Sequence, residues 1–173
     1  MKIKKYKSIS STSALAKKLK KAEPWLVFWA QEQTAGYGRK KNYWFSPKGG
    51  LYFSVILPKS KIEDLQTLTI LAAFVVTKTI KENFNLEPFI KLPNDVYVNQ
   101  KKIAGILTEN VIGKEVKFSI MGIGLNTNIE KFPKELENRA TSLKIELGER
   151  VNNEKILKQI VKGIKEQLKT ISE

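Results

Sequence analysis

A glycine-bearing, cationic segment at residues 31–50 carries the groups best suited to bind an anion. Gly36 and Gly38 let the backbone approach a ligand closely, and Arg39 follows with two lysines behind it. Exposed backbone N–H groups beside a bidentate guanidinium can hold a phosphate or a carboxylate. The same composition also fits a mobile surface loop with solvated charges, and the local sequence does not decide between them.

Neither glycine pair of the chain matches a common nucleotide fingerprint. Lys41 stands where G-x-G-x-x-G requires its third glycine, and no helix pattern begins there. The spacing of a P-loop is also missing. The second pair, Gly122 and Gly124, is best interpreted as a turn at a strand end.

The composition removes the commonest catalytic groups. The 173 residues contain no histidine and no cysteine. This excludes Ser-His-Asp and Cys-His nucleophilic mechanisms, disulfides, and metal sites built on those ligands. Any chemistry must therefore use lysine, arginine, carboxylates, backbone N–H groups and a bound cofactor.

The charge balance is strongly basic, with 31 Lys and Arg against 17 Asp and Glu, for a net charge of +14. Such a charge is compatible with a basic nucleic-acid-binding domain. However, the only arginines are Arg39, Arg139 and Arg150, and arginine is the usual reader of base edges. A solvated, lysine-rich surface is the main interpretation, and nucleic-acid binding is kept as an alternative.

The spacing of apolar residues predicts the elements that must position these groups. Strands are predicted at residues 3–9, 25–30, 51–57, 88–91, 96–98, 102–109 and 115–121. A first helix is predicted to begin after the capping residues 10–13 and to end near residue 22. Two further helices are predicted over 64–84 and 153–171. Residues 122–128 are predicted to form a second glycine-bearing loop. An antiparallel middle flanked by helices indicates a single α+β domain.

Nothing in the sequence points to a membrane. The longest apolar run, near residues 71–76, is far shorter than the roughly 20 residues that span a bilayer. No secretory apolar segment follows the lysines of the first 21 residues. We therefore expect a cytoplasmic protein without a membrane partner.

Six sequence blocks, in the same order, resemble those of biotin–protein ligases. They are residues 11–13, 32–39 running into 44–54, 91–97, 102–107, 122–126 and 140–143. Any single block is weak, but the ordered set is highly specific. The resemblance implies the fold of the class II aminoacyl-tRNA synthetase and biotin ligase catalytic domains, a mixed, largely antiparallel sheet backed by helices.

The resemblance also implies a two-step, ATP-dependent ligation. Biotin and MgATP would give biotinyl-5′-adenylate, and a specific lysine of a biotin carboxyl carrier protein or carboxylase carrier domain would then accept biotin and release AMP. Such a reaction needs no covalent enzyme intermediate. Mg²⁺ is expected through the ATP phosphates, because the chain shows no direct metal-binding motif.

The resemblance assigns the biotin site residue by residue. Ser11, Thr12 and Ser13 would contact the ureido ring with help from Gln33, and Gly105 would leave room for the ring system. Ser11 and Thr12 also suit a helix cap, and the two roles can coexist.

The resemblance assigns the activated end of the ligand to a second group. Arg39 and Lys102 would hold the acyl-phosphate, and Asp95 would position or deprotonate the acceptor lysine. The further ligand-binding positions are Gly36, Tyr37 and Gly38 over the carboxyl group, Trp44 near adenine, Lys91, Asn94 by the phosphates or Mg²⁺, and Asn126 on the adenylate. Structural alternatives are a core role for Trp44, a surface role for Lys91 and a turn at Asn94.

Five positions depart from the family pattern. Ser13 replaces the usual asparagine, Tyr37 stands where many members carry arginine, and Leu92 replaces a tryptophan. Lys41 and Asn42 also differ from the common G-R-G-R-R-G-R loop. These departures keep a non-catalytic biotin binder as an alternative, and a lipoate–protein ligase of the same fold is the nearest other one.

The predicted domain organisation is a single catalytic domain over residues 1–173. The helix-turn-helix domain of family repressors and the C-terminal β-barrel of many members are expected to be absent, so no DNA partner is predicted. A homodimer through a sheet edge is compatible with the resemblance.

Overall fold

Alternating apolar residues produce strands that join one sheet in the computed structural model, which describes residues 1–58 and 64–172. The strand order is β1-β2-β3-β7-β6-β5-β4. The strand bounds are β1 Lys2–Tyr6, β2 Leu26–Ala30, β3 Leu51–Ile56, β4 Phe89–Lys91, β5 Asp95–Val98, β6 Lys101–Ile112 and β7 Val116–Leu125. Among the strand pairs of the described residues, β1 and β2 alone run parallel. The mixed, largely antiparallel sheet and the α+β class are confirmed.

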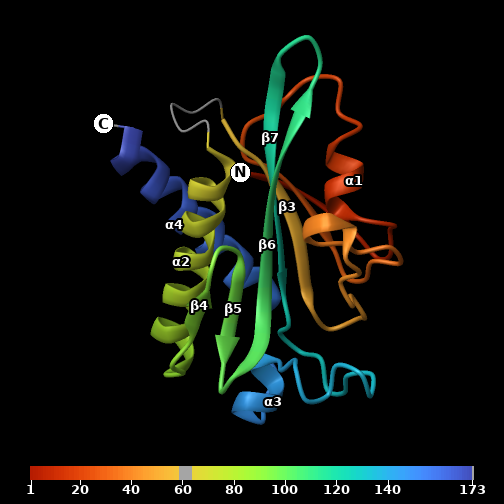
Figure 1. Ribbon diagram of the computed structural model, residues 1–173, viewed down its shortest axis with the longest axis vertical. Helices are drawn as coiled ribbons and strands as arrows, with labels where there is room; N and C mark the ends of the chain where they lie inside the picture. The colour runs from red at the N-terminus through yellow and green to blue at the C-terminus, as the bar shows by residue number, and fades with distance from the viewer. Residues whose placement is uncertain (59–63, 173) are drawn as a thin grey trace.

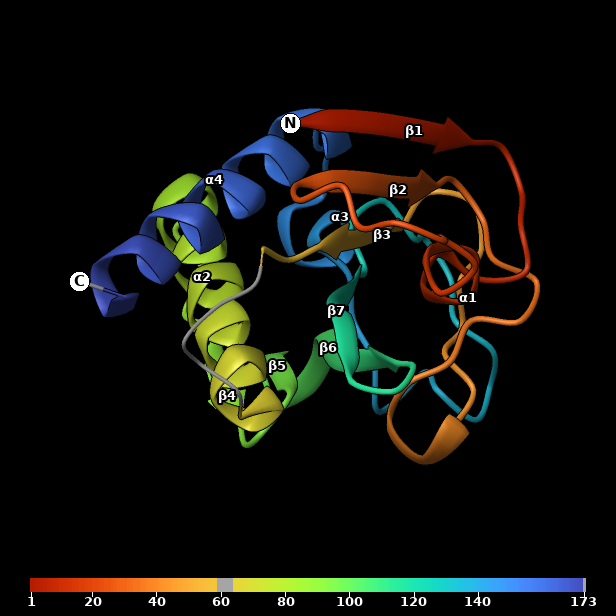
Figure 2. The same ribbon diagram turned by 90° about the horizontal axis from the view of Figure 1, so that it is seen from above.

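Helices cover both faces of the sheet (Figure 1). Their bounds are α1 Thr12–Ala16, α2 Leu65–Phe84, α3 Leu143–Leu147 and α4 Asn153–Ser172. In β3, Phe53 and Val55 belong to the large core with α2 and α4, whereas Ser54 and Ile56 face α1. Figure 2 shows α1 on the face opposite α2 and α4. Every residue of β3 is therefore buried.

The two long helices follow their predicted spans and faces. In α2, Leu68, Ala72 and Val76 are buried, and Asp64 caps the start by accepting hydrogen bonds from the backbone N–H groups of residues 66 and 67. In α4, Ile160 is one of the buried residues of an apolar stripe. No helix within the described ranges has the length and apolarity needed to cross a bilayer.

The first helix is shorter than predicted. It ends at Ala16, although Leu19 still packs against the smaller core. The prediction to residue 22 is wrong, because Lys17, Lys18 and two further lysines would place like charges three and four residues apart along the same helix.

The central strands are longer than predicted. The hairpin of β6 and β7 extends beyond the other strands (Figure 1). β7 continues to Leu125, so the loop predicted from residue 122 is wrong at its start, and Gly122 and Gly124 lie inside a strand. Asn99 and Gln100 form the turn between β5 and β6, with φ angles of 47° and 63° that suit a tight hairpin.

Candidate active site

A β-bulge in β6 directs Lys102 into the site. Opposite β5, Val96 pairs with Ala104 while Tyr97 pairs with Lys102, so one residue of β6 is left without a partner. An extra residue reverses the alternation of side chains along a strand. Lys102 therefore shares a face with Gly105, and its Cε lies 3.5 Å from where a Cβ on Gly105 would be.

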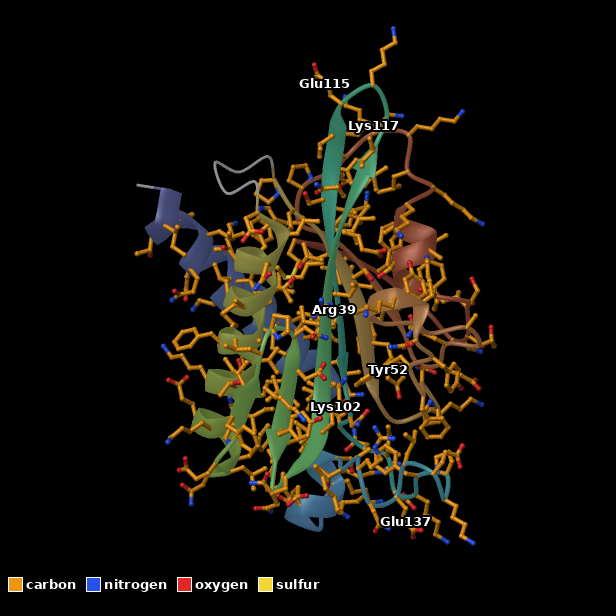
Figure 3. All side chains as sticks on the ribbon, in the orientation of Figure 1. Arg39, Tyr52, Lys102, Glu115, Lys117 and Glu137 are labelled. Atoms are coloured by element: carbon orange, nitrogen blue, oxygen red, sulfur yellow. The ribbon has the colours of Figure 1, made fainter. Side chains whose placement is uncertain are left out.

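A chain of polar contacts joins the predicted catalytic residues. The Nζ of Lys102 lies 2.7 Å from Oδ1 of Asp95, and both side chains are largely buried. Asn94 donates to the same Asp95 oxygen at 2.9 Å and accepts a hydrogen bond from Arg39 at 3.4 Å. In Figure 3, Arg39 and Lys102 lie along the middle of the sheet, far from the hairpin tip. Residues from the loop, β5 and β6 thus form one connected group.

A cavity of about 350 Å³, here named the first cavity, opens beside this group. It contains three cationic side chains, Arg39, Lys40 and Lys102, and among its described lining residues Asp95 is the one carboxylate. The excess of positive charge suits two anionic groups. Its lining consists of Ser11, Thr12, Ser13, Gln33, Tyr37, Gly38, Arg39, Lys40, Asn42, Tyr43, Trp44, Phe53, Asn94, Asp95, Lys102, Gly105, Ile106, Leu107, Gly122, Ile123 and Gly124.

One part of the first cavity is lined by hydroxyl groups. The hydroxyls of Thr12 and Ser13 lie 2.8 and 2.9 Å from the Oγ of the fully buried Ser54. Gln33 accepts from the backbone N–H of Thr12 at 2.8 Å. Ser11 caps α1 by accepting from a backbone N–H at 3.3 Å, as its alternative role predicted. The structure therefore brings these four predicted residues together, and it adds Ser54.

Trp44 separates the first cavity from a second one. Its ring fits against glycine backbone, because a Cβ at Gly124 would lie 2.4 Å from Nε1 and a Cβ at Gly105 would lie 3.0 Å from the ring. Lys102 lies over the same ring at 5.1 Å. The second cavity has a volume of about 220 Å³ and shares Tyr43, Trp44 and Lys102 with the first.

The second cavity is lined by the segment between β7 and α3. Phe132, Leu136 and Arg139 contribute to it, with Asn126 at its inner end. Asn126 is buried and donates from Nδ2 to the carbonyl of Thr141 at 3.0 Å. The predicted residue Asn126 thus lies at the second cavity and not at the first.

Two predicted residues lie outside both cavities. Lys91 is exposed on β4, with its Nζ 5.3 Å from the centre of the Tyr97 ring. Gly36 is buried, and a Cβ there would lie 2.5 Å from the Oγ of Ser46. A surface role for Lys91 and a packing role for Gly36 are what their contacts support.

Several residues of the site were not predicted from the sequence. Ser54 lies within a block quoted for the family resemblance, but its inward direction depends on β3 pairing with β7. Phe132 and Arg139 lie in a connector without apolar periodicity, which gave no signal. Tyr43 has only its aromatic character beside Trp44 to suggest a role.

Tyr37 lines the first cavity but its hydroxyl turns outward. It donates to Oε2 of Glu109 at 3.2 Å, and Lys17 contacts the other oxygen of Glu109 at 2.7 Å. Burial raises the pKa of the Tyr37 phenol above its ordinary value, and the nearby Glu109 carboxylate adds to that rise. The phenol is therefore a neutral donor at physiological pH.

The site has no cage for a metal ion. Among residues 1–58 and 64–172, no three acidic residues lie close enough together to hold one. Asp95 is already paired with Lys102. These groups fit a cation that arrives with its own phosphate ligands better than one held by the protein alone.

Comparisons with known proteins agree with this arrangement. Residues 6–126 match the Biotin/lipoate A/B protein ligase family. The bifunctional ligase/repressor BirA of Bacillus subtilis is 39% identical over 137 residues, covering 76% of this chain and 42% of that protein. The chain therefore spans less than half the length of this relative.

Solved structures share the fold over nearly the whole chain. The biotin protein ligase from Aquifex aeolicus in complex with biotin and ATP matches with a TM-score of 0.91 and 32% identity, over 99% of this chain and 72% of that one. The Leishmania major biotin protein ligase in complex with biotinyl-5-AMP matches with a TM-score of 0.78 and 25% identity, over 94% and 73%. Since the family match alone extends over more than half of its residues, the chain belongs to the biotin/lipoate A/B protein ligase family.

Proposed function

We propose that this chain activates biotin with ATP and transfers it to a lysine of a carrier protein. The observation that carries the proposal is the position of Lys102, which lines both cavities beside Trp44. Biotin would occupy the first cavity and the nucleotide the second. The carboxylate of one ligand and the α-phosphate of the other would then meet at one ammonium group.

In the first step, a carboxylate oxygen of biotin would attack the α-phosphorus of ATP. A new P–O bond forms, the bond to the leaving pyrophosphate breaks, and biotinyl-5′-adenylate results. Lys102 and Arg39 would hold the two anions in line and neutralise the charge that develops as they approach. Asp95 keeps the Lys102 ammonium in place through its contact at 2.7 Å.

In the second step, the neutral ε-amine of the acceptor lysine would attack the acyl carbon of the adenylate. The C–N bond of the amide forms, the C–O bond to the phosphate breaks, and AMP leaves. The amine must lose a proton, and Asp95 is the carboxylate nearest to this reaction among the residues of the first cavity. We therefore assign Asp95 to positioning or deprotonating the acceptor.

The hydroxyl-lined part of the first cavity supports biotin over lipoate. A ureido group offers two N–H donors and one carbonyl acceptor, whereas a dithiolane ring offers no hydrogen-bond donor. Both the N–H donors and the carbonyl acceptor of the ureido group can pair with Thr12, Ser13 and Gln33. These three residues hydrogen-bond with one another, with Ser54 or with Ser46. A ureido ring would add hydrogen bonds to them, worth roughly 0.5–1.5 kcal/mol each, and a dithiolane ring would not.

Other parts of the proposal rest on chemistry and on relatives. Mg²⁺ would be held through the ATP phosphates, where it would offset their charge. We place the reaction in the cytoplasm, where ATP is available, and we assign residues 1–173 to one catalytic domain acting on a biotin carboxyl carrier protein or carrier domain. Relatives in complex with biotin and ATP favour this function over nucleic-acid binding. A homodimer stays a prediction for light scattering to test.

The proposal is tested with the complete reaction. The purified chain is incubated with MgATP, a carrier domain, and either biotin or lipoate, and the mass of the carrier and the AMP released are measured. We expect one biotin on one carrier lysine with an equal amount of AMP, and no modification by lipoate. An unmodified carrier and no AMP from a folded chain would instead support a non-catalytic binder, and modification by lipoate alone would contradict the assignment of biotin.

A further inference from the structure

Glu109 of β6 joins two segments that are far apart in the sequence. Its Oε1 accepts from Lys17, just after α1, at 2.7 Å, and its Oε2 accepts from the Tyr37 hydroxyl at 3.2 Å. The Glu109 and Lys17 side chains are only 21% and 31% exposed. The Tyr37 ring also has the ammonium of Lys41 at 4.3 Å from its centre and that of Lys17 at 5.5 Å. Tyr37 is thus fixed at its hydroxyl and at its ring.

This arrangement anchors the loop that carries Arg39. Tyr37 is two residues before Arg39, and both line the first cavity. The loop that carries both residues is closed by a hydrogen bond from the Gly38 N–H to the Asn42 carbonyl at 2.8 Å. Arg39 reaches Asn94 at the other side of the cavity. The loop therefore has one tether through Tyr37 and a second through Arg39.

The positive charge of Lys17 strengthens its contact with Glu109. Partial burial lowers the pKa of Lys17, but hydrogen bonds with Glu109 and Tyr37 outweigh this, so its pKa lies above the ordinary value. Lys17 is therefore charged at neutral pH, and a hydrogen bond between charged groups is stronger than one between neutral groups. Tyr37 occupies the position that is arginine in many family members. Its neutral hydroxyl donates a hydrogen bond to Glu109.

We infer that Glu109 is a positioning residue, which fixes Tyr37 and so keeps the Arg39 loop over the first cavity. The consequence for the ligand rests on the proposed function: Glu109 sets how long the biotinyl-adenylate stays bound. Glu109 does not line the cavity among the described residues, so its effect passes through Tyr37. The Glu109–Tyr37 contact, outside the first cavity, thereby controls the release of biotinyl-adenylate from inside it.

The test compares Glu109→Gln and Tyr37→Phe with a matched control, Glu115→Gln. Glu115 lies at the tip of the same hairpin, far from Arg39 (Figure 3). One readout is the rate of tryptic cleavage after Arg39, Lys40 and Lys41 in the chain without ligand. The other is the rate of release of pre-formed biotinyl-adenylate, chased with unlabelled biotin and ATP.

We expect Glu109→Gln to speed both rates by about tenfold and Tyr37→Phe by about threefold, in line with the difference between charged and neutral hydrogen bonds. The double variant should be no faster than Glu109→Gln alone, because both changes remove the same tether. Glu115→Gln should leave both rates unchanged. The midpoint of thermal unfolding should stay within a few degrees of the wild type in all variants.

Two results would overturn the inference. One is that Glu109→Gln matches the Glu115→Gln control in both rates. The other is that both rates rise only in proportion to a general loss of thermal stability, which would make Glu109 a structural residue. If the wild-type chain forms no adenylate, the proposed function fails, and the cleavage rates alone decide whether Glu109 holds the loop.

Discussion

At the scale of single residues, the site depends on a few cations whose positions are fixed by their neighbours. Lys102 is held by Asp95 and by the face of the Trp44 ring. Arg39 reaches the same group through Asn94. Because these contacts are made within the protein, the proposed reaction would need little reorganisation of the site as charge develops between biotin and ATP.

Replacing Lys102 with methionine should slow adenylate formation by about 100- to 1000-fold, the usual effect of losing one group that stabilises developing charge. The measurement is the steady-state rate of pyrophosphate release with biotin and MgATP. Lys101→Met is the control, because the Lys101 side chain donates to the carbonyl of Glu137 at 3.1 Å and lines neither cavity among the described residues. A loss of less than tenfold in Lys102→Met would contradict the role of Lys102.

Gly124→Ala should displace Trp44, because the new Cβ would lie 2.4 Å from Nε1 of the indole. We expect the KM for ATP to rise by about tenfold, since Trp44 borders the second cavity, and the KM for biotin to rise as well, since Gly124 and Trp44 both line the first. The additional change Trp44→Phe removes the clashing atoms and should restore the thermal stability lost in Gly124→Ala. An unchanged KM for ATP in the single variant would show that Trp44 does not support the nucleotide.

At the scale of elements, short structures around β6 and β7 decide which side chains meet. The bulge at Lys102 turns one side chain toward the cavity. The short helix α3 follows the segment that lines the second cavity and is fixed by Ser142, whose Oγ accepts from the backbone N–H of Ile145 at 3.1 Å. The same hydroxyl donates to the carbonyl of Ile129 at 2.6 Å. Ser142 thereby connects the start of α3 to Ile129, near the other end of that segment.

Ser142→Ala should lower the free energy of unfolding by about 1–2 kcal/mol, because it removes a helix cap and leaves a buried carbonyl without its donor. Urea denaturation measures the loss. Ser142→Thr keeps the hydroxyl and serves as the control, with a smaller loss expected. Equal losses in the two variants would mean that side-chain size, and not the cap, determines the effect.

The sequence predicted the strands and long helices well, because their apolar residues follow one clear period each. It failed for α1, where charge repulsion among the lysines overrides an apolar pattern. It also failed for Gly122 and Gly124, because the strand there depends on Trp44 and Ser13 packing against glycine. Motif resemblance identified the groups around Lys102, whereas Ser54 and Glu109 required the sheet register.

At the scale of the whole molecule, the ends of the chain are tied together by charge. β1, at the N-terminus, is the edge strand beside β2, and the C-terminal helix α4 lies next to the start of β1 (Figure 2). Glu154 of α4 accepts from Lys5 of β1 at 2.6 Å and lies 2.9 Å from Lys158. These two ammonium groups lower the pKa of Glu154 from 4.5 to about 2.

This shift predicts a pH-dependent stability difference between wild type and Glu154→Gln. A carboxyl group whose pKa is lower in the folded state stabilises the fold above its ordinary pKa, and that contribution is lost as the pH falls. The wild type should therefore unfold at a higher temperature at pH 7, and the difference should shrink between pH 4.5 and about 2. Thermal unfolding followed by circular dichroism measures it, with Glu166→Gln as control. A difference that does not change over this pH range would contradict the ion-pair account.

The most direct test of the central claim is the exchange of labelled pyrophosphate into ATP, with Mg²⁺ and either biotin or lipoate. Exchange reports the first step alone and needs no carrier protein. The account predicts exchange with biotin, none with lipoate, and loss of the signal in Lys102→Met. Exchange with lipoate alone, or none with either acid by a folded chain, would contradict it.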